Sequence, residues 1–439
     1  MSSILASLEL SSLNNSFFSI HTNLNESILT TSCIVPLKSQ ELVKIGRSKS
    51  CNIQVESDYV SSLHGILWSV QFDEDTPPLF YLNDSSRNGI IHNHAEIGSG
   101  RTVILEDGDI IELKLAAKFV FKCIRYEIHC SINFESMIEG WEVSNKLIGS
   151  GSFGSVYVAN KQNTKSLFAV KIIPNAHSSY FPSSNSNKKT ESSMLFEVRH
   201  PNIIKVHDAI TIDSNLYIFQ DLVCGGDLFS YLIDGKFLKP IAEPEAILIV
   251  FQLMQALNFL HRELSIVHRD LKLDNILLEI PIPQSKIYLC DFGIAKYLDN
   301  SQQTTDSCVG TIEYCAPEVF SNNTKFEPYI SSQIPNDGYN FKCDLWSLGV
   351  ICHILLSGIS PFYADGDKGN MIRAARFGRL NLNKPQFQKI TSFAKDFISK
   401  LLKVNPQQRM SIEECFEHPW IKSNRKKLDW YYCKLIPKQ

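Results

Sequence analysis

The chain has 439 residues, of which 44% are hydrophobic and 20% charged, with a formal net charge of −3. This composition predicts two or three soluble globular domains, and the charge excludes the overall basic field that bulk nucleic-acid binding needs. The sequence contains no apolar run near the roughly 20 residues that span a bilayer, and its 12 cysteines include no C-x-x-C pair. We therefore expect reduced thiols, no direct nucleic-acid partner, no membrane partner and an intracellular protein.

The N-terminal third is expected to consist of short strands. Residues 1–35 are rich in Ser, Asn and Thr; the first dozen are candidates for disorder and the rest for opening strands. Many short β-type segments with Gly, Asn and Asp turns and no helical period predict an all-β sandwich. The expected strands cover residues 42–45, 66–72, 79–82, 102–105, 110–115 and 119–125.

Polar clusters in the loops of this sandwich suggest a binding site. They are Gly46-Arg47-Ser48, Ser61-Ser62-Leu63-His64 and Ser86-Arg87-Asn88-Gly89. Their order and spacing resemble the forkhead-associated (FHA) domain, a sandwich whose loops at one end bind phosphothreonine. The resemblance implies that Arg47 and Ser61 hold the phosphate, that Asn88 binds the peptide backbone and that His64 braces the loops. Forked guanidinium donors and a hydroxyl match phosphate oxygens chemically.

A second pattern begins at Trp141, after a connection over residues 126–140 in which residues 132–138 have helical character. An apolar run over residues 168–173 is broken by Lys171, and a strand buried on both faces tolerates such a charge only when it is paired. Upstream lies a glycine-rich run whose backbone can approach phosphates closely. That run is Ile148-Gly149-Ser150-Gly151-Ser152-Phe153-Gly154-Ser155-Val156.

The chemical centre of the chain is the stretch of residues 268–275, His-Arg-Asp-Leu-Lys-Leu-Asp-Asn, followed after 16 residues by Asp291-Phe292-Gly293. Its carboxylate, lysine and amide, with a second acid at fixed distance, are suited to phosphoryl transfer with two metal ions. Asp270 would orient and deprotonate a hydroxyl, and Lys272 would neutralise the transferring phosphate. Asn275 and Asp291 would hold Mg²⁺.

These residues resemble the catalytic loop of the eukaryotic protein kinases. The resemblance implies that the glycine-rich run covers the phosphates of ATP and that Lys171 pairs with Glu191 on the next helix, with Glu197 as the alternative. Lys272 and the Gly310-Thr311 loop match the branch that phosphorylates serine or threonine in protein substrates.

The resemblance also places the hinge between the two kinase lobes. Backbone groups of Asp221 and Val223 would bind adenine, and Gln220 occupies the gatekeeper position, where an apolar or β-branched residue is commoner. Asp227 would bind the ATP ribose or a substrate arginine; the alternative is an ordinary aspartate that starts a helix.

The activation segment is expected between Asp291 and the Ala-Pro-Glu sequence that ends at Glu318. Arg269, beside the catalytic base, is suited to receive a phosphate from this segment. Ser307 and Thr311 are the candidate phosphorylation sites, modified between two associated copies; Thr311 could instead align Asp270. Glu318 would pair with Arg409 as a structural bond.

The sequence thus predicts a multidomain protein in which an all-β FHA sandwich precedes a bilobal α+β protein kinase fold. Helical spacing of apolar residues supports an α-rich second lobe, with helices over residues 245–261, 393–404 and 412–421. The expected domains are the FHA domain (1–125), a linker (126–140), the kinase domain (141–421, with lobes 141–222 and 223–421) and a tail (422–439). The tail is expected to be a solvated, basic end.

A phosphothreonine reader joined to such a kinase resembles the checkpoint kinases, and the compact order and Gln220 look closest to their fungal meiosis-specific branch. This resemblance implies a nuclear protein, recruited to a phosphorylated protein of meiotic chromosome axes, that acts in recombination and checkpoint signalling. One alternative is a general DNA-damage kinase, which expression outside meiotic cells would indicate. The other is a pseudokinase scaffold; the presence of Lys171, Asp270 and Asp291 argues against it.

Overall fold

The computed structural model describes residues 4–13, 20–22, 34–38, 41–72, 76–123, 134–151, 154–164, 166–174, 196, 198–291, 296–297, 312–320, 340–362 and 367–436. The chain divides into two compact units. The first comprises residues 1–174 with 215–224, and the second residues 175–214 with 225–439. Within the described ranges, no helix combines the length and the apolar character that crossing a membrane requires.

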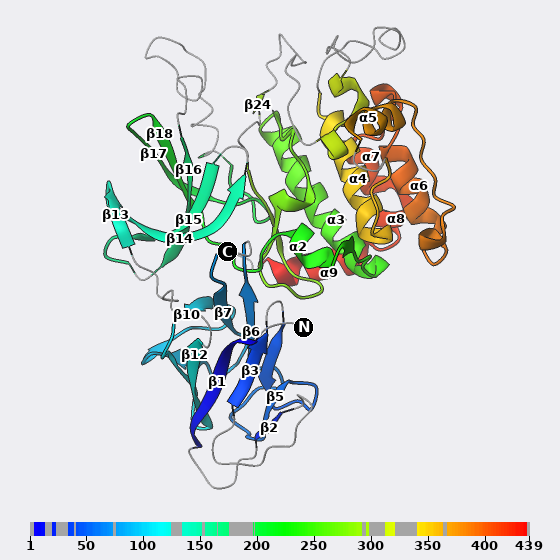
Figure 1. The fold of residues 1–439 in the computed structure, drawn as a ribbon. Coiled ribbons are helices and arrows are strands. Elements are labelled where there is room, and N and C mark those ends of the chain that lie inside the picture. The colour runs from blue at the N-terminus through cyan, green and yellow to red at the C-terminus, as the bar shows by residue number, and fades with distance from the viewer. Residues whose placement is uncertain are drawn as a thin grey trace. The chain divides into compact units, whose positions relative to one another are not determined.

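Two six-stranded sheets form the expected β-sandwich in the first unit, drawn in blue and cyan in Figure 1. One sheet has the order β3-β1-β12-β11-β8-β9 and the other β10-β7-β6-β4-β5-β2. The strands are β1 (Ile4–Leu13), β2 (Ile20–Thr22), β3 (Ile34–Lys38), β4 (Val43–Gly46), β5 (Ile53–Val55), β6 (Gly65–Val70), β7 (Leu79–Asp84), β8 (Ile90–His92), β9 (Ala95–Glu96), β10 (Thr102–Leu105), β11 (Ile110–Leu113) and β12 (Ala117–Cys123).

The first dozen residues are a candidate for disorder from composition, but those of them that the structure describes belong to a strand, Ile4–Leu13. β1 pairs with both β12 and β3, so it lies inside its sheet and not at its edge. Leu5 and Leu8 are buried in the core between the two sheets. Burial of these apolar side chains offsets the entropy lost in ordering a segment whose composition is otherwise polar.

A third six-stranded sheet has the order β13-β14-β15-β16-β18-β17, and its strands other than β17 belong to the first unit. The helical expectation for residues 132–138 is wrong in the described part, because Phe134–Ile138 is a strand paired with β14. Glu139 and Gly140 both have positive φ, the geometry of a tight hairpin turn. The strands are β13 (Phe134–Ile138), β14 (Trp141–Gly151), β15 (Gly154–Lys161), β16 (Leu167–Ile173), β17 (Val206–Ile212) and β18 (Asn215–Asp221).

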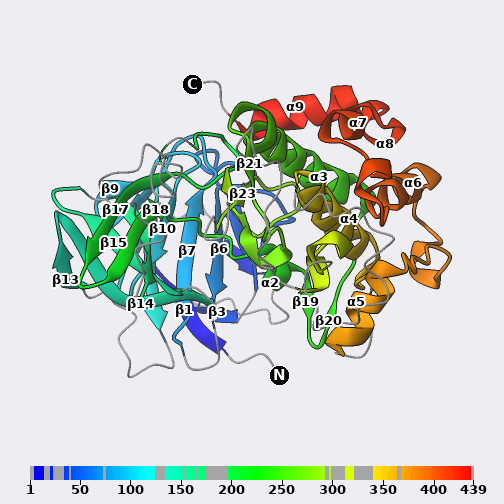
Figure 2. The ribbon, with the colours of Figure 1, turned by 90° about the horizontal axis from the view of Figure 1, so that it is seen from above.

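The second unit is mainly helical, as the apolar spacing predicts (Figure 2). Its helices are α2 (Leu228–Leu232), α3 (Glu243–Asn258), α4 (Lys342–Ser357), α5 (Lys368–Arg376), α6 (Ser392–Leu401), α7 (Ile412–Glu417), α8 (Pro419–Lys422) and α9 (Arg425–Leu435). Its short strand pairs are β19 (Ile233–Asp234) with β20 (Phe237–Leu238), β21 (Ile266–Val267) with β24 (Lys296–Tyr297), and β22 (Ile276–Leu278) with β23 (Ile287–Leu289).

The C-terminal segment is a helix and not a solvated end. α9 lies against α3 in both ribbon views, and the rings of Tyr432 and Phe251 meet edge to face at 5.7 Å. Leu428 is buried, and the basic residue Arg425 pairs with Asp429 one turn later. Charge alone suggests a solvated end because the apolar residues that face α3 are few and interleaved with lysines.

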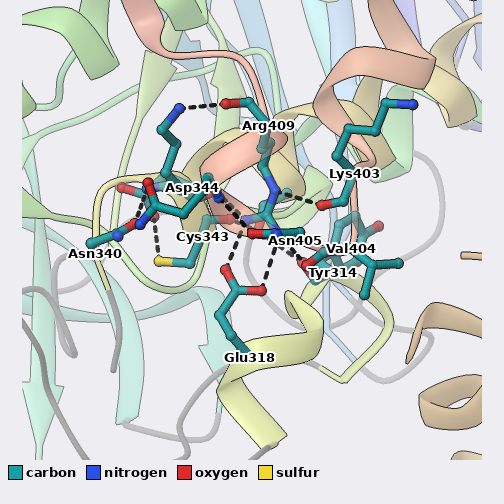
Figure 3. Close-up of polar contacts among 12 residues, drawn as sticks. Tyr314, Glu318, Asn340, Cys343, Asp344, Lys403, Val404, Asn405 and Arg409 are labelled. Atoms are coloured by element: carbon teal, nitrogen blue, oxygen red, sulfur yellow. Dashed lines mark hydrogen bonds and ion pairs between the residues drawn. The ribbon is translucent and has the colours of Figure 1, made fainter. Parts of the chain in front are cut away.

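The second unit contains a buried ion pair between Glu318 and Arg409, which the sequence predicts (Figure 3). Arg409 donates to both carboxylate oxygens of Glu318, at 2.7 and 3.0 Å, and also donates to the carbonyls of Lys342 and Lys403. Its guanidinium also lies over the Trp346 ring at 5.0 Å. The side chains of Arg409 and Glu318 are 0% and 5% exposed. The N–H donors of the guanidinium therefore satisfy a carboxylate charge that water cannot reach.

Replacing Arg409 by alanine is expected to lower the free energy of unfolding by about 3–5 kcal/mol, because Glu318 keeps a buried charge without its partner. Urea unfolding of the full chain, followed by circular dichroism, measures the change. The control is Arg262→Ala, which breaks an ion pair with Glu413 whose side chains are 62% and 46% exposed; its expected cost is at most about 1 kcal/mol. Equal losses in both variants would contradict this account.

Candidate functional site

The proposed catalytic residues of the second unit lie together on one loop between β21 and β22. The Lys272 ammonium is 2.9 Å from Oδ2 of Asp270. Asn275 donates through Nδ2 to the carbonyl and to Oδ2 of Asp270, at 2.7 and 3.0 Å. Asp270 and Asn275 are both 5% exposed, so the acid is held by fixed donors and not by solvent.

Asp344, at the start of α4, fixes the backbone of this loop. Its carboxylate accepts the main-chain N–H groups of His268 and Arg269, each at 2.9 Å, and is 2.8 Å from Nε2 of His261. Burial alone would raise the pKa of Asp344, but hydrogen bonding and charge from His261 outweigh it, and the pKa lies below its ordinary value. Asp344 therefore stays ionised and accepts all three donors.

This carboxylate is a functional residue that sequence reasoning missed. Arg269 has φ +69°, a left-handed conformation that costs a side-chain-bearing residue free energy and that neighbouring structure must enforce. The two bonds from Asp344 supply that enforcement from 75 residues away. The one sequence feature that could have indicated this role is an aspartate in the first turn of an apolar helix. Aspartate is also common at the start of ordinary helices, so the feature is not specific.

The hairpin β22–β23 brings the two proposed metal ligands to one end. Cys290 donates its N–H to the carbonyl of Asn275 at 2.9 Å, and Asp291 follows directly. Because Nδ2 of Asn275 is committed to Asp270, its side-chain oxygen is the atom left to face a cation. An amide oxygen and a carboxylate are the donors that Mg²⁺ prefers, so the residues present fit the ion.

Asp227 starts α2, as its alternative interpretation predicts. Its carboxylate accepts the N–H and the hydroxyl of Ser230, each at 2.8 Å. Burial, and to a lesser extent the charge of Asp274, raises the pKa of Asp227 above its ordinary value. A helix cap thus uses both carboxylate oxygens, and any contact to ribose or arginine shares them.

The proposed nucleotide-binding residues of the first unit lie on or next to the third sheet. Gly154 has φ +150°, and a Cβ there would lie 2.1 Å from the carbonyl of Ile172, so no other residue fits. Lys171 lies in the middle of β16, between Val156 on β15 and Ile218 on β18. Gln220 and Asp221 end β18, opposite Ala169 and Phe168, and Val223 follows.

Some proposed residues lie outside the described parts of the chain. They are Ser152, Phe153, Glu191 with its alternative Glu197, Ser307 and Thr311. The other residues of the glycine-rich run belong to β14 and β15.

The three loop clusters of the sandwich meet at one end of it. Arg47 donates its main-chain N–H to the carbonyl of Ser61 at 2.9 Å, and a Cβ at Gly46 would lie 2.4 Å from the carbonyl of Ser62. Arg87 donates its N–H to the Ser61 hydroxyl at 3.1 Å. The side chain of Arg47 is half exposed, as its proposed role in binding phosphate requires.

Buried polar residues hold these loops in place. His64 is fully buried, and its Nδ1 accepts the N–H of Ser61 at 3.0 Å. Burial lowers the pKa of His64 despite opposition from the Gly89 carbonyl and Asp84, which keeps Nδ1 an acceptor. Asp84, also fully buried, accepts from Ser86 and from the N–H of Ile90.

The third proposed phosphopeptide residue, Asn88, is held by a hydrogen bond to the main chain of another loop. Its Nδ2 donates to the carbonyl of Tyr59 at 2.7 Å. No sequence pattern could indicate this contact of Tyr59, because every residue type carries a main-chain carbonyl.

Known proteins match both parts of the chain. A protein kinase domain matches residues 142–421 and an FHA domain residues 43–114. The chain is 39% identical to the meiosis-specific serine/threonine-protein kinase MEK1 of Saccharomyces cerevisiae, over 95% of this chain and 88% of that protein. It is 37% identical to the meiosis-specific serine/threonine-protein kinase mek1 of Schizosaccharomyces pombe, over 91% and 85%. It is also 30% identical to the ovarian-specific serine/threonine-protein kinase Lok of Drosophila melanogaster, over 83% and 73%.

The protein kinase match covers more than half of the chain, and the two fungal relatives align with 95% and 91% of it. The chain therefore belongs to the protein kinase family, as a serine/threonine protein kinase that carries an FHA domain and is similar to the fungal meiosis-specific kinases.

Proposed function

We propose that the protein transfers the γ-phosphoryl group of ATP to serine or threonine residues of proteins that its FHA domain binds through phosphothreonine. The observation that carries the catalytic part is the arrangement of Asp270, Lys272 and Asn275 on a loop whose backbone Asp344 fixes. Because charge is spread over the transferring phosphate, positioning and fixed charges supply most of the acceleration.

Each residue has a defined part in this proposal. Asp270 would accept the proton of the substrate hydroxyl and orient it, while Lys272, 2.9 Å from that carboxylate, would neutralise the transferring phosphate. Asn275 and Asp291 would hold Mg²⁺, which neutralises phosphate charge when bound. Lys171 and Glu191 would align the α- and β-phosphates, and backbone groups of the hinge would bind adenine.

The FHA loops supply the recruitment part of the proposal. Arg47 and Ser61 would bind the phosphate of phosphothreonine, and Asn88 the peptide backbone. Support comes from the assembly of these residues at one end of the sandwich, on loops held by His64 and Asp84.

We further propose activation by phosphorylation of Ser307 or Thr311, between two copies brought together by the FHA domain. The support is Arg269, a cation beside the catalytic base whose backbone is fixed by Asp344. A phosphate paired with this guanidinium would order the activation segment.

The proposed cellular role is meiotic recombination and checkpoint signalling in the nucleus, with a phosphorylated protein of the chromosome axis as the recruiting partner. The support is the likeness to two fungal meiosis-specific kinases along nearly the whole chain. A general DNA-damage kinase is the alternative.

Asp270→Asn is expected to reduce phosphorylation of a basic Ser/Thr peptide by at least about 100-fold, because the amide cannot accept the hydroxyl proton. Radiolabelled ATP measures the transfer, and binding of MgADP should persist in the variant. The control is Asp234→Asn, at the exposed end of β19, which should leave the rate unchanged. Full activity of Asp270→Asn would refute the catalytic assignment.

Arg47→Ala is expected to weaken binding of phosphothreonine peptides by about 10- to 100-fold, the loss of charge-assisted bonds to phosphate. Titration with peptides selected from a phosphopeptide library measures it. Lys122→Ala is the control. Lys122 lies near one end of β12, and it is the other end of β12 that lies on the side of Ile90. Peptide binding that survives Arg47→Ala would remove the phosphate-clamp assignment.

Active enzyme is expected to carry phosphate on Ser307 or Thr311, and the variant with alanine at both positions is expected to be inactive. Mass spectrometry and the peptide assay measure these two outcomes. Active enzyme with no phosphate on Ser307 or Thr311, together with full activity of the double variant, would contradict the activation proposal.

A further inference from the structure

The FHA sandwich buries one sheet on both of its faces. In the pairing of β6 with β7, Leu67 lies opposite Leu82, and both belong to the core between the two sheets. Trp68 lies opposite Tyr81 and therefore on the other face. An outer face of an antiparallel sheet is usually solvated and polar.

This outer face is instead apolar and covered. Besides Trp68 and Tyr81, which are 1% and 3% exposed, it carries further buried side chains by the same alternation. These are Ile66, Leu79 and Ile104, and none of them belongs to the core cluster of the sandwich. A second packing partner, in addition to the opposite sheet, must therefore remove this face from water.

The end of the hinge segment lies on this face, within the same compact unit. Trp68 donates its indole N–H to the main-chain carbonyl of Cys224 at 3.0 Å. The rings of Trp68 and Tyr81 are stacked, with centroids 5.7 Å apart. Burial, and then the neighbouring Cys224 thiol, raises the pKa of Tyr81 well above its ordinary value. Trp68 and Tyr81 of the sheet thus both lie next to the hinge residue Cys224.

The position of Cys224 gives this contact a consequence for nucleotide binding. Cys224 directly follows Val223, whose backbone is proposed to bind adenine. A donor that fixes the carbonyl of Cys224 limits the backbone torsions of both residues, so the amide of Val223 is held in one direction before the ligand arrives. Such preorganisation removes part of the ordering cost of binding.

We propose that Trp68 is a positioning residue of the ATP site, through which the FHA domain holds the kinase hinge in its nucleotide-binding conformation. This inference rests on the proposed role of the hinge in binding adenine. It makes the FHA domain a structural part of the nucleotide site as well as a reader of phosphothreonine.

The test compares MgADP binding to the full-length chain and to Trp68→Phe by isothermal titration calorimetry. Phenylalanine keeps an aromatic ring against Tyr81 and removes the N–H donor. The expected result is a dissociation constant about threefold to tenfold higher, as for the loss of one neutral hydrogen bond. KM for ATP should rise by the same factor with little change in kcat, and hydrogen exchange at residues 222–225 should be faster.

The matched control is Ser69→Ala, one residue along β6 and opposite Phe80 on the core-facing side, which should bind MgADP like the wild type. Retained phosphothreonine-peptide binding verifies that the variants are folded. Tyr81→Leu is a second variant, because it removes the stacking partner of Trp68, and it should weaken MgADP binding in the same direction.

An unchanged dissociation constant and unchanged exchange in both Trp68→Phe and Tyr81→Leu would overturn the inference. If instead the wild-type chain itself failed to bind MgADP, the proposed function would be at fault. The two failures are therefore distinguishable.

Discussion

The geometry of the proposed catalytic loop depends on one buried carboxylate. Asp344 accepts the backbone N–H groups of His268 and Arg269 and contacts the His261 ring, so a helix of the second unit fixes a loop that has little regular structure of its own. Because the acid is 1% exposed, its charge is unscreened and its bonds are strong. The left-handed backbone at Arg269 persists because these bonds hold it.

The second buried charge, the Glu318–Arg409 pair, serves a different purpose. Taking two ions out of water costs free energy that their attraction repays only when the geometry is nearly ideal. Here bidentate donation, two backbone carbonyls and the Trp346 ring satisfy the guanidinium. The pair joins the end of the proposed activation segment to the helical core, so it specifies where that segment ends.

The FHA sandwich shows a similar division between the residues proposed to bind phosphothreonine and the residues that support them. Arg47 is half exposed, whereas His64 and Asp84, which hold the loops beside it, are fully buried. A supporting residue must be rigid and shielded, and a ligand-binding residue must be reachable. The outer face that carries Trp68 adds a structural role to the same domain.

Short motifs with fixed local spacing were sufficient to predict the fold class, the order of the domains and the identity of the proposed catalytic residues. Sequence reasoning misjudged residues 132–138 and the C-terminal helix, where packing outweighs local composition. The tertiary structure alone decided the roles of Asp344 and Trp68. Their partners lie 75 and 156 residues away in the chain, and a contact over such a distance leaves no spacing for a sequence pattern to show.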